Sequence, residues 1–271
     1  MPIITSRDHP VIKQLVKLEK STPFRKKTSL TLLDGPHLVQ AYYAVFGAPP
    51  CLIIDQSRRD QHEIKSLLDL IGQQAKTKIY HISDTLFRHV SPVKTPSGIL
   101  ATIPIPATTK IISDDQKNSF CVLLEAIQDP GNLGSILRTA AAANVNDIYL
   151  SRDCADTWSP KTLRAAMGAH FSIRIHEKCN LQEIIQQFNG KVKVVATSLR
   201  VKKNLYHLTL TGPIAFIFGN EGSGVSEAIL HATEEKITIQ MPGKTESLNA
   251  AAAAAICLFE KVRQESLTHT E

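Results

Sequence analysis

The chain has 271 residues, of which 43% are hydrophobic and 21% are charged, and its formal net charge at pH 7 is +6. This length suits one large or two ordinary globular domains, and the composition excludes an intrinsically disordered chain. No apolar run is long enough to span a membrane, and the first residues do not resemble a signal peptide, so we expect no membrane association.

The five cysteines are odd in number and scattered along the chain, at positions 51, 121, 154, 179 and 257. They form no CxxC pair and have no zinc-ligand spacing with histidines. We therefore expect reduced thiols, a cytoplasmic protein and no bound metal.

The positive charge is concentrated in the first part of the chain. Residues 1–106 contain 14 Lys and Arg against 8 Asp and Glu, whereas residues 107–271 contain 17 of each kind. This asymmetry predicts a polyanion-binding module joined to a neutral one, with a solvated helix face as the alternative. The candidate polyanion contacts are Arg7, Lys13, Lys17, Arg25, Lys26 and Lys27.

Strands alternate with helices over residues 1–106, which predicts a small α/β domain. Its first element is an amphipathic helix containing Val11, Leu15 and Leu18. A polar and proline-containing stretch, residues 107–118, indicates a linker after this domain. The other predicted elements are strands 30–33, 52–55, 78–81 and 98–103 and helices 36–46, 61–73 and 85–88.

A second α/β unit is predicted over residues 119–271. Its fully apolar strands are typical of a parallel sheet that is buried on both faces. Small-residue loops follow these strands, at the edge where such sheets bind ligands. The predicted elements are strands 120–127, 147–151, 171–175, 192–197, 213–218 and 237–241, helices 135–143, 159–168 and 181–188, and an alanine-rich helix from about residue 250.

Three loops carry the candidate chemistry. DPGNLG predicts a tight turn that contains Asn132, with Arg138 one helical turn beyond Gly134. Glu221 follows a buried strand, and Ser247 and Asn249 precede the alanine-rich helix, where they could cap the helix or bind a ligand. Each loop could instead be structural, with a salt-bridged arginine, a helix-entry carboxylate and a simple cap.

Two nucleotide-binding motifs are absent from these loops. Gly243-Lys244-Thr245 lacks the glycine that a phosphate-binding P-loop requires at position 238, which is Thr238. The glycines at 219, 222 and 224 do not have the GxGxxG spacing. The sequence therefore disfavours an NTPase or a dinucleotide-dependent enzyme.

Taken together, the three loops resemble a known family. DPGNLGSILRTA, FIFGNEGSGVS and IQMPGKTESLNAAAAAAI are similar to motifs 1, 2 and 3 of the SpoU (TrmH-type) branch of the SPOUT RNA methyltransferases, in that order. SPKTLRAAMGAHF resembles the segment between motifs 1 and 2. SRDHPVIKQLVKL, LTLLDGPHLVQAY and SGILATI resemble the L30e-like substrate-binding domain of ribosomal RNA members. The chain departs from the family pattern at Asp34, usually a glutamate, and near Ala165 and Ala166, often a serine.

The resemblance implies methyl transfer from S-adenosyl-L-methionine to a ribose 2′-hydroxyl, in large-subunit ribosomal RNA, by a homodimer whose active site lies near the subunit interface. It also implies a C-terminal trefoil knot in the catalytic domain, which pattern reasoning alone would not predict because threaded chains are rare. The family's catalytic residues correspond to Asn132, Arg138, Glu221, Ser247 and Asn249. Its cofactor contacts correspond to Thr197, Ser198, Phe218, Gly219, Ile239 and Leu248.

Alternatives remain at this point. A tRNA methyltransferase is the first, although such members usually lack the large N-terminal domain. A non-catalytic RNA-binding or ribosome-assembly protein of the same fold is the second, and a small-molecule methyltransferase is the third. If the two domains are independent, removing residues 1–106 should leave a folded dimer that binds cofactor but no longer modifies RNA.

Overall fold

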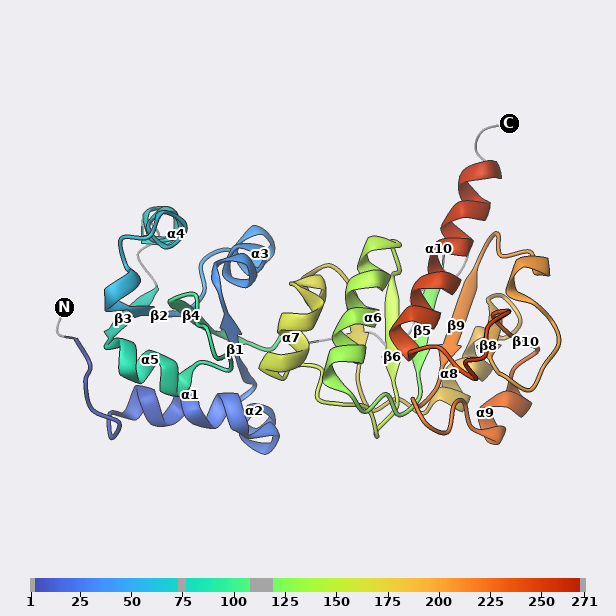
Figure 1. The fold of residues 1–271 in the computed structure, drawn as a ribbon, viewed down its shortest axis with the longest axis horizontal. Coiled ribbons are helices and arrows are strands. Elements are labelled where there is room, and N and C mark those ends of the chain that lie inside the picture. The colour runs from blue at the N-terminus through green and yellow to red at the C-terminus, as the bar shows by residue number, and fades with distance from the viewer. Residues whose placement is uncertain (1–2, 73–76, 108–118, 269–271) are drawn as a thin grey trace. The chain divides into compact units, whose positions relative to one another are not determined.

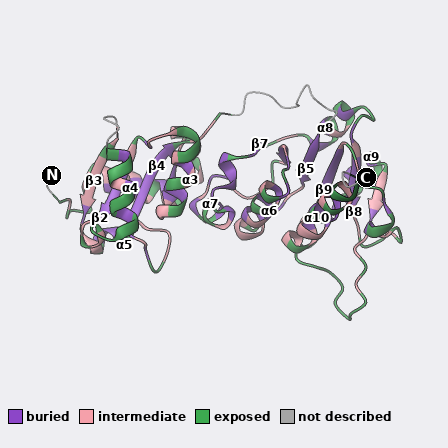
Figure 2. Ribbon diagram, turned by 90° about the horizontal axis from the view of Figure 1, so that it is seen from above, coloured by how far each residue is buried: buried purple, intermediate pink, exposed green. Residues whose placement is uncertain are grey.

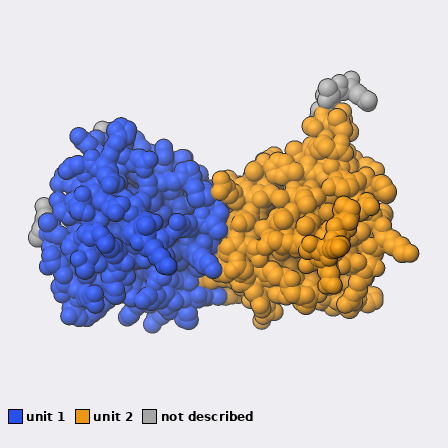
Figure 3. Space-filling model, in the orientation of Figure 1, with its two compact units in different colours: residues 1–107, 158–171 blue, residues 108–157, 172–271 orange. Residues whose placement is uncertain are grey.

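In a computed structural model of the chain, residues 3–72, 77–107 and 119–268 are described. Contacts divide the chain into two units, drawn in two colours in Figure 3. The first unit contains residues 1–107 and 158–171, and the second contains residues 108–157 and 172–271. The predicted linker, residues 107–118, falls almost entirely outside the described residues.

The first unit is built on a mixed four-stranded sheet in the order β1-β4-β2-β3. Strand β4 runs antiparallel to both of its neighbours, β1 and β2, whereas β2 and β3 run parallel. The strands are β1 (Leu30–Asp34), β2 (Cys51–Asp55), β3 (Lys78–Ile82) and β4 (Ile99–Pro104).

Helices cover both faces of this sheet because successive strand residues point to opposite sides (Figure 1). Leu32 is buried with residues of α1 and α5, whereas the next residue, Leu33, is buried with residues of α3 and α4. The helices of the first unit before residue 107 are α1 (Pro10–Lys20), α2 (Thr22–Thr28), α3 (Pro36–Phe46), α4 (His62–Gly72) and α5 (Asp84–Val90).

Residues 158–171 complete the core of the first unit, although the chain on either side of them belongs to the second. They form α7 (Pro160–Ala166) and a 3-10 turn, Ala169–Phe171. Trp158, Leu163 and Phe171 are buried in the α3 and α4 side of the core, and Thr31 Oγ1 donates a hydrogen bond to the carbonyl of Trp158 at 2.6 Å. The first unit therefore extends beyond the N-terminal domain predicted from the sequence.

The second unit contains a six-stranded sheet in which all pairs are parallel, in the order β10-β8-β9-β5-β6-β7. Its central strands are buried on both sides, as Figure 2 shows. This confirms the predicted α/β class with a parallel sheet. The strands are β5 (Phe120–Leu124), β6 (Asp147–Leu150), β7 (Arg174–His176), β8 (Lys193–Thr197), β9 (Ile214–Phe218) and β10 (Glu235–Ile237).

Helices again pack on both faces of the second sheet (Figure 1). On one face, α8 (Leu181–Phe188) and α9 (Glu227–Ala232) are buried against β5, β6, β8 and β9. On the other, the alanine-rich α10 (Ala250–Thr268) packs against α6 (Pro130–Ala142) and β9. The predicted knot depends on how the chain threads between these elements, and it stays a prediction.

Three sequence predictions about local structure were wrong. DPGNLG is not a tight turn: Asp129 caps α6 by accepting a hydrogen bond from the Asn132 amide at 2.8 Å, so the helix begins at Pro130. Strand β10 ends at Ile237, because Thr238 instead pairs with the loop at Lys203 and Leu205. The predicted strand 171–175 is replaced by a 3-10 turn followed by β7.

Candidate active site

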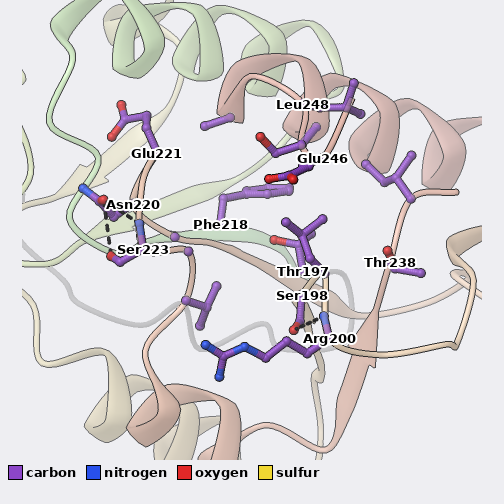
Figure 4. Close-up of a pocket in the computed structure, with 18 of the residues that line it drawn as sticks. Thr197, Ser198, Arg200, Phe218, Asn220, Glu221, Ser223, Thr238, Glu246 and Leu248 are labelled. Atoms are coloured by element: carbon purple, nitrogen blue, oxygen red, sulfur yellow. Dashed lines mark hydrogen bonds between the residues drawn. The ribbon is translucent and has the colours of Figure 1, made fainter. Parts of the chain in front are cut away.

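A pocket of about 400 Å³ lies at the carboxyl ends of β8 and β9 (Figure 4). Its walls come from three segments that are far apart in the sequence: residues 197–200, 218–225 and 237–253. Parallel strands end at a common edge of the sheet, which explains why these segments meet. The structure places in this pocket all six residues predicted to bind a cofactor: Thr197, Ser198, Phe218, Gly219, Ile239 and Leu248.

The pocket has apolar walls on one side, and on the other it has polar side chains that form hydrogen bonds with nearby backbone groups. Phe218, Ile239 and Leu248 supply the apolar surface. The Thr197 hydroxyl donates to the Ile217 carbonyl at 3.2 Å, and Ser198 Oγ accepts a hydrogen bond from the Arg200 amide at 3.2 Å. These two side chains therefore hold the loop after β8 in shape.

Gly219 is required because the loop after β9 folds back onto it. A Cβ at this position would lie 2.2 Å from both the Gly224 carbonyl carbon and the Val225 nitrogen. The close approach is fixed by two backbone hydrogen bonds between Asn220 and Gly224, at 3.0 and 2.9 Å, and Gly224 itself has a φ of +72°. The wall of the pocket at this point is therefore backbone.

The Asn220 side chain organises this loop, a role that sequence reasoning missed. Its Oδ1 accepts hydrogen bonds from the amides of Gly222 and Ser223 at 2.9 and 3.1 Å, and its Nδ2 donates to the Ala126 carbonyl at 2.8 Å. Figure 4 shows the contacts with Ser223. An asparagine close to glycines is a known turn signal, but its bond to Ala126 has no local signature.

A second link, between Glu125 and Ser226, was also missed. The Glu125 carboxylate accepts hydrogen bonds from the Ser226 amide at 2.8 Å and from its hydroxyl at 2.7 Å. Ser226 in turn caps α9. The start of the loop after β5 is thus joined to the end of the loop after β9, although the two residues are 101 positions apart in the sequence.

Three of the five predicted catalytic residues form a continuous hydrogen-bonded chain. Asn249 Nδ2 donates to Asn132 Oδ1 at 2.8 Å, and Asn132 Nδ2 donates to Glu221 Oε1 at 3.0 Å. Glu221 also accepts from the amides of Gln128 and Asp129, both at 3.2 Å. The network connects the starts of α6 and α10 to the loop after β9.

The Glu221 carboxylate is held in its ionised form by these contacts. Burial raises its pKa, but hydrogen bonds from Asn132 and from backbone amides outweigh burial and keep the pKa below its ordinary value. A carboxylate with several donors and a lowered pKa is a weak base. Glu221 is therefore suited to positioning Asn132.

The remaining two catalytic predictions occupy different places. Ser247 lines the pocket, and its hydroxyl has no hydrogen-bond partner among the described residues. Arg138 is exposed on α6, does not line the pocket, and has no ion pair within the described part of the chain. Because α6 begins at Pro130, Arg138 lies about 9 Å along the helix axis from Asn132 and on another side of it. The expectation that both point to one sheet edge is not met within a single chain.

Five of the six candidate polyanion contacts are exposed on or beside α1 and α2: Arg7, Lys13, Lys17, Lys26 and Lys27. The sixth, Arg25, is a correction. Its side chain is only 3% exposed, and Nη1 donates to the carbonyls of Leu18 at 2.6 Å and Glu19 at 3.1 Å. Arg25 therefore caps the end of α1 and is not available to a polyanion.

Asp34, where the sequence departs from the family pattern, ends β1 in a largely buried position. Burial raises the pKa of its carboxyl to about 6, against the opposing effects of Arg164 and Ser91. Its Oδ1 atom is buried and has no hydrogen-bond partner in the described residues. This carboxyl is therefore a local source of instability when ionised.

The pocket fits an adenosine-containing ligand. Its volume lies in the range of small-molecule sites, and the backbone wall at Gly219 allows a flat ring to approach closely. Within residues 3–72, 77–107 and 119–268, His, Cys, Asp and Glu side chains form no group of three that could hold a metal ion. No helix in the same ranges is both long and apolar enough to cross a membrane.

Comparison with known families covers nearly the whole chain. Residues 119–259 match the SpoU rRNA Methylase family, and residues 9–101 match the MRM3-like substrate binding domain.

Individual proteins are similar over the same span. The 23S rRNA guanosine-2′-O-methyltransferase RlmP of Bacillus subtilis is 33% identical, over 96% of this chain and 98% of its own length. An uncharacterized tRNA/rRNA methyltransferase of Synechocystis is 31% identical, over 97% and 94%. The structure of the SpoU methyltransferase AviRb from Streptomyces viridochromogenes, in complex with AdoMet, matches with a TM-score of 0.81 at 23% identity, over 95% of this chain and 99% of that chain. This last likeness concerns the fold.

Proposed function

Because this chain belongs to the SpoU rRNA methylase family, we propose that it methylates the ribose 2′-hydroxyl of a guanosine in large-subunit ribosomal RNA. It is an S-adenosyl-L-methionine-dependent RNA ribose methyltransferase. The observation that carries the proposal is the convergence of three separated segments, at 197–200, 218–225 and 237–253, on one pocket. The full-length similarity to RlmP, including the substrate-binding region, supports ribosomal RNA over tRNA as the substrate.

The six cofactor-binding predictions, Thr197, Ser198, Phe218, Gly219, Ile239 and Leu248, would hold the donor through backbone groups and apolar walls. When bound, S-adenosyl-L-methionine supplies a methyl group that is already activated on a sulfonium. The sulfonium charge is lost in the transition state, so an apolar and water-poor wall favours transfer. The protein must then align the 2′-oxygen and help to remove its proton.

Different residues divide these tasks. The hydrogen-bonded network of Asn249, Asn132 and Glu221 fixes the positions of the loops around the pocket relative to one another, because each side chain is bonded to the next. Ser247 offers the pocket a hydroxyl that is not used by another described residue, and it would orient the ribose. Arg138 would bind the neighbouring phosphate and lower the pKa of the 2′-hydroxyl electrostatically, because a guanidinium is too poor a base to take the proton itself.

We further propose that the enzyme is a homodimer in which Arg138 serves the pocket of the partner subunit. The exposed position of Arg138, outside its own pocket, supports this arrangement. The exposed lysines of α1 and α2 would bind RNA phosphates without reading sequence, so that RNA shape selects the site. A cytoplasmic location, with its five free cysteines reduced, belongs to the same proposal.

Mapping of 2′-O-methyl groups tests the substrate. In a strain that lacks this gene, one guanosine in large-subunit ribosomal RNA should lose its methyl group, and the wild-type gene should restore it. Arg138→Ala should not restore it, yet the purified variant should bind cofactor within about twofold of wild type. Arg138→Lys should also fail because a point charge does not reproduce a bidentate fork. Loss of a tRNA methyl group instead would reject the ribosomal assignment.

Mixed dimers test the placement of Arg138. Arg138→Ala and Gly219→Ala subunits are assayed at a donor concentration near the wild-type dissociation constant, at which the Gly219→Ala pocket stays almost empty. Each should have little activity alone, and the two should regain about a quarter of wild-type activity when exchanged one to one. In the mixed dimer, the subunit with an intact pocket receives Arg138 from its partner. Absence of any recovery would place Arg138 in the pocket of its own chain.

A further inference from the structure

Three charged side chains line the pocket: Arg200, Glu221 and Glu246. Two of them have partners within the protein. Arg200 forms an ion pair with Glu227, and Glu221 accepts three hydrogen bonds. The Glu246 carboxylate has neither an ion pair nor a hydrogen bond among the described residues.

Glu246 lies close enough to the pocket for its charge to act on a bound ligand. Figure 4 shows it on the wall that also carries Leu248 and Phe218, away from Arg200. Lys244, the cation nearest to it in the sequence, is not among the lining residues. Glu246 therefore places on the pocket wall, next to apolar surface, a negative charge that no described residue pairs, and a cation bound in the pocket would be attracted to it.

We propose that Glu246 sets the preference of this pocket for the cationic methyl donor over the product. The inference rests on the proposed function. Methyl transfer breaks the bond between sulfur and the methyl carbon, the electron pair stays on sulfur, and the ribose oxygen that gains the methyl loses its proton. S-Adenosylhomocysteine therefore lacks the methyl group and, with it, the sulfonium charge, but keeps every other group of the donor. Glu246 is a specificity residue that acts on this difference in charge.

The expected size of the effect follows from electrostatics. A full charge several ångströms away, in partly water-like surroundings, changes affinity about three- to tenfold. Because Glu246 is exposed, salt should weaken the effect. The same carboxylate stabilises the charged donor more than the transition state, in which that charge is disappearing, so it does not accelerate the chemical step.

Calorimetric titration of the full-length protein tests the proposal. Dissociation constants are measured for S-adenosyl-L-methionine and S-adenosylhomocysteine with wild type, Glu246→Gln and the control Glu234→Gln, an exposed glutamate outside the pocket. The ratio of the product constant to the donor constant should fall about three- to tenfold in Glu246→Gln and should not change in Glu234→Gln. The fall should shrink between about 50 mM and about 1 M salt.

Further outcomes are equally decisive. Glu246→Asp keeps the charge and should keep most of the discrimination between donor and product. Equal weakening of donor and product by Glu246→Gln would overturn the proposal, since it would indicate a contact with a group that both ligands share. Failure of wild type to bind either ligand would overturn the proposed function itself.

Discussion

Replacing Gly219 by alanine tests the claim that backbone forms the wall of the cofactor pocket. The added Cβ would lie 2.2 Å from the Gly224 carbonyl carbon and the Val225 nitrogen, both backbone atoms. An ordinary contact needs at least 3.4 Å, so the loop must move by about 1 Å. No flexible side chain is available to absorb this displacement.

The cost can be worked from the contacts that hold the loop. Three sets of hydrogen bonds tie residues 219–226 to the loop after β5. They join Ser226 to Glu125, Asn220 to Ala126, and Glu221 to the Gln128 and Asp129 amides. Overpacking costs about 1–3 kcal/mol, and weakening one or two of these bonds adds about 1 kcal/mol each. A total of about 3 kcal/mol, if it falls on the pocket, weakens cofactor binding roughly a hundredfold.

Titration calorimetry with S-adenosyl-L-methionine measures the effect, and Gly222→Ala is the matched control. A Cβ at Gly222 would meet only the Asn220 side chain at 3.5 Å, an ordinary contact. We expect Gly222→Ala to bind within about threefold of wild type. Binding by Gly219→Ala within the same margin would refute the backbone-wall argument, because a displacement of that size could not have left the pocket unchanged.

Two further predictions concern the first unit. Burial places the folded-state pKa of Asp34 at about 6, above its ordinary value of 3.8, so the stability from its neutral form is complete below about pH 4 and is lost as the pH rises through 6. Asp34→Asn should therefore raise the free energy of unfolding by about 3 kcal/mol at pH 8 and hardly change it at pH 4. Denaturant unfolding at both pH values measures the two free energies. An equal gain at pH 4 and pH 8 would contradict the raised pKa of Asp34. The double variant Lys26→Ala, Lys27→Ala should bind RNA more weakly, and the steepness of its log affinity against log salt should fall by about 1.5. Lys65→Ala, on α4, is the control and should change neither the affinity nor this slope. An unchanged slope in the double variant would show that α2 does not contact the RNA.

The sequence predicted the large elements because their signals are local. The apolar run before Glu125 and the strand before Gly219 needed no tertiary information to be identified as buried strands. The pocket segments were predicted because strand ends share one edge and because three motifs resembled a known family. The start of α6 was misplaced because Pro130 and Gly131, which favour turns, were given more weight than the Asp129 cap.

Contacts between distant residues were beyond sequence reasoning. Glu125 and Asn220 look like ordinary loop residues, and only the fold brings them to Ser226 and Ala126. Arg25 was assigned to RNA by charge alone, whereas its guanidinium satisfies carbonyls at the end of a helix that it follows by five residues. A charge in the sequence does not reveal whether its side chain is solvated.

The assignment of residues 158–171 to the first unit changes how the protein can be divided. The polypeptide passes between the units three times, after residues 107, 157 and 171, so proteolysis within 108–118 would nick the enzyme without releasing either half. Deletion of residues 1–106 would remove the apolar partners of Trp158, Leu163 and Phe171. The remaining protein would expose these side chains to solvent and would tend to aggregate, in contrast to the folded dimer expected if the two domains were independent. A functional chimaera with a relative would therefore have to exchange residues 1–107 and residues 158–171 together.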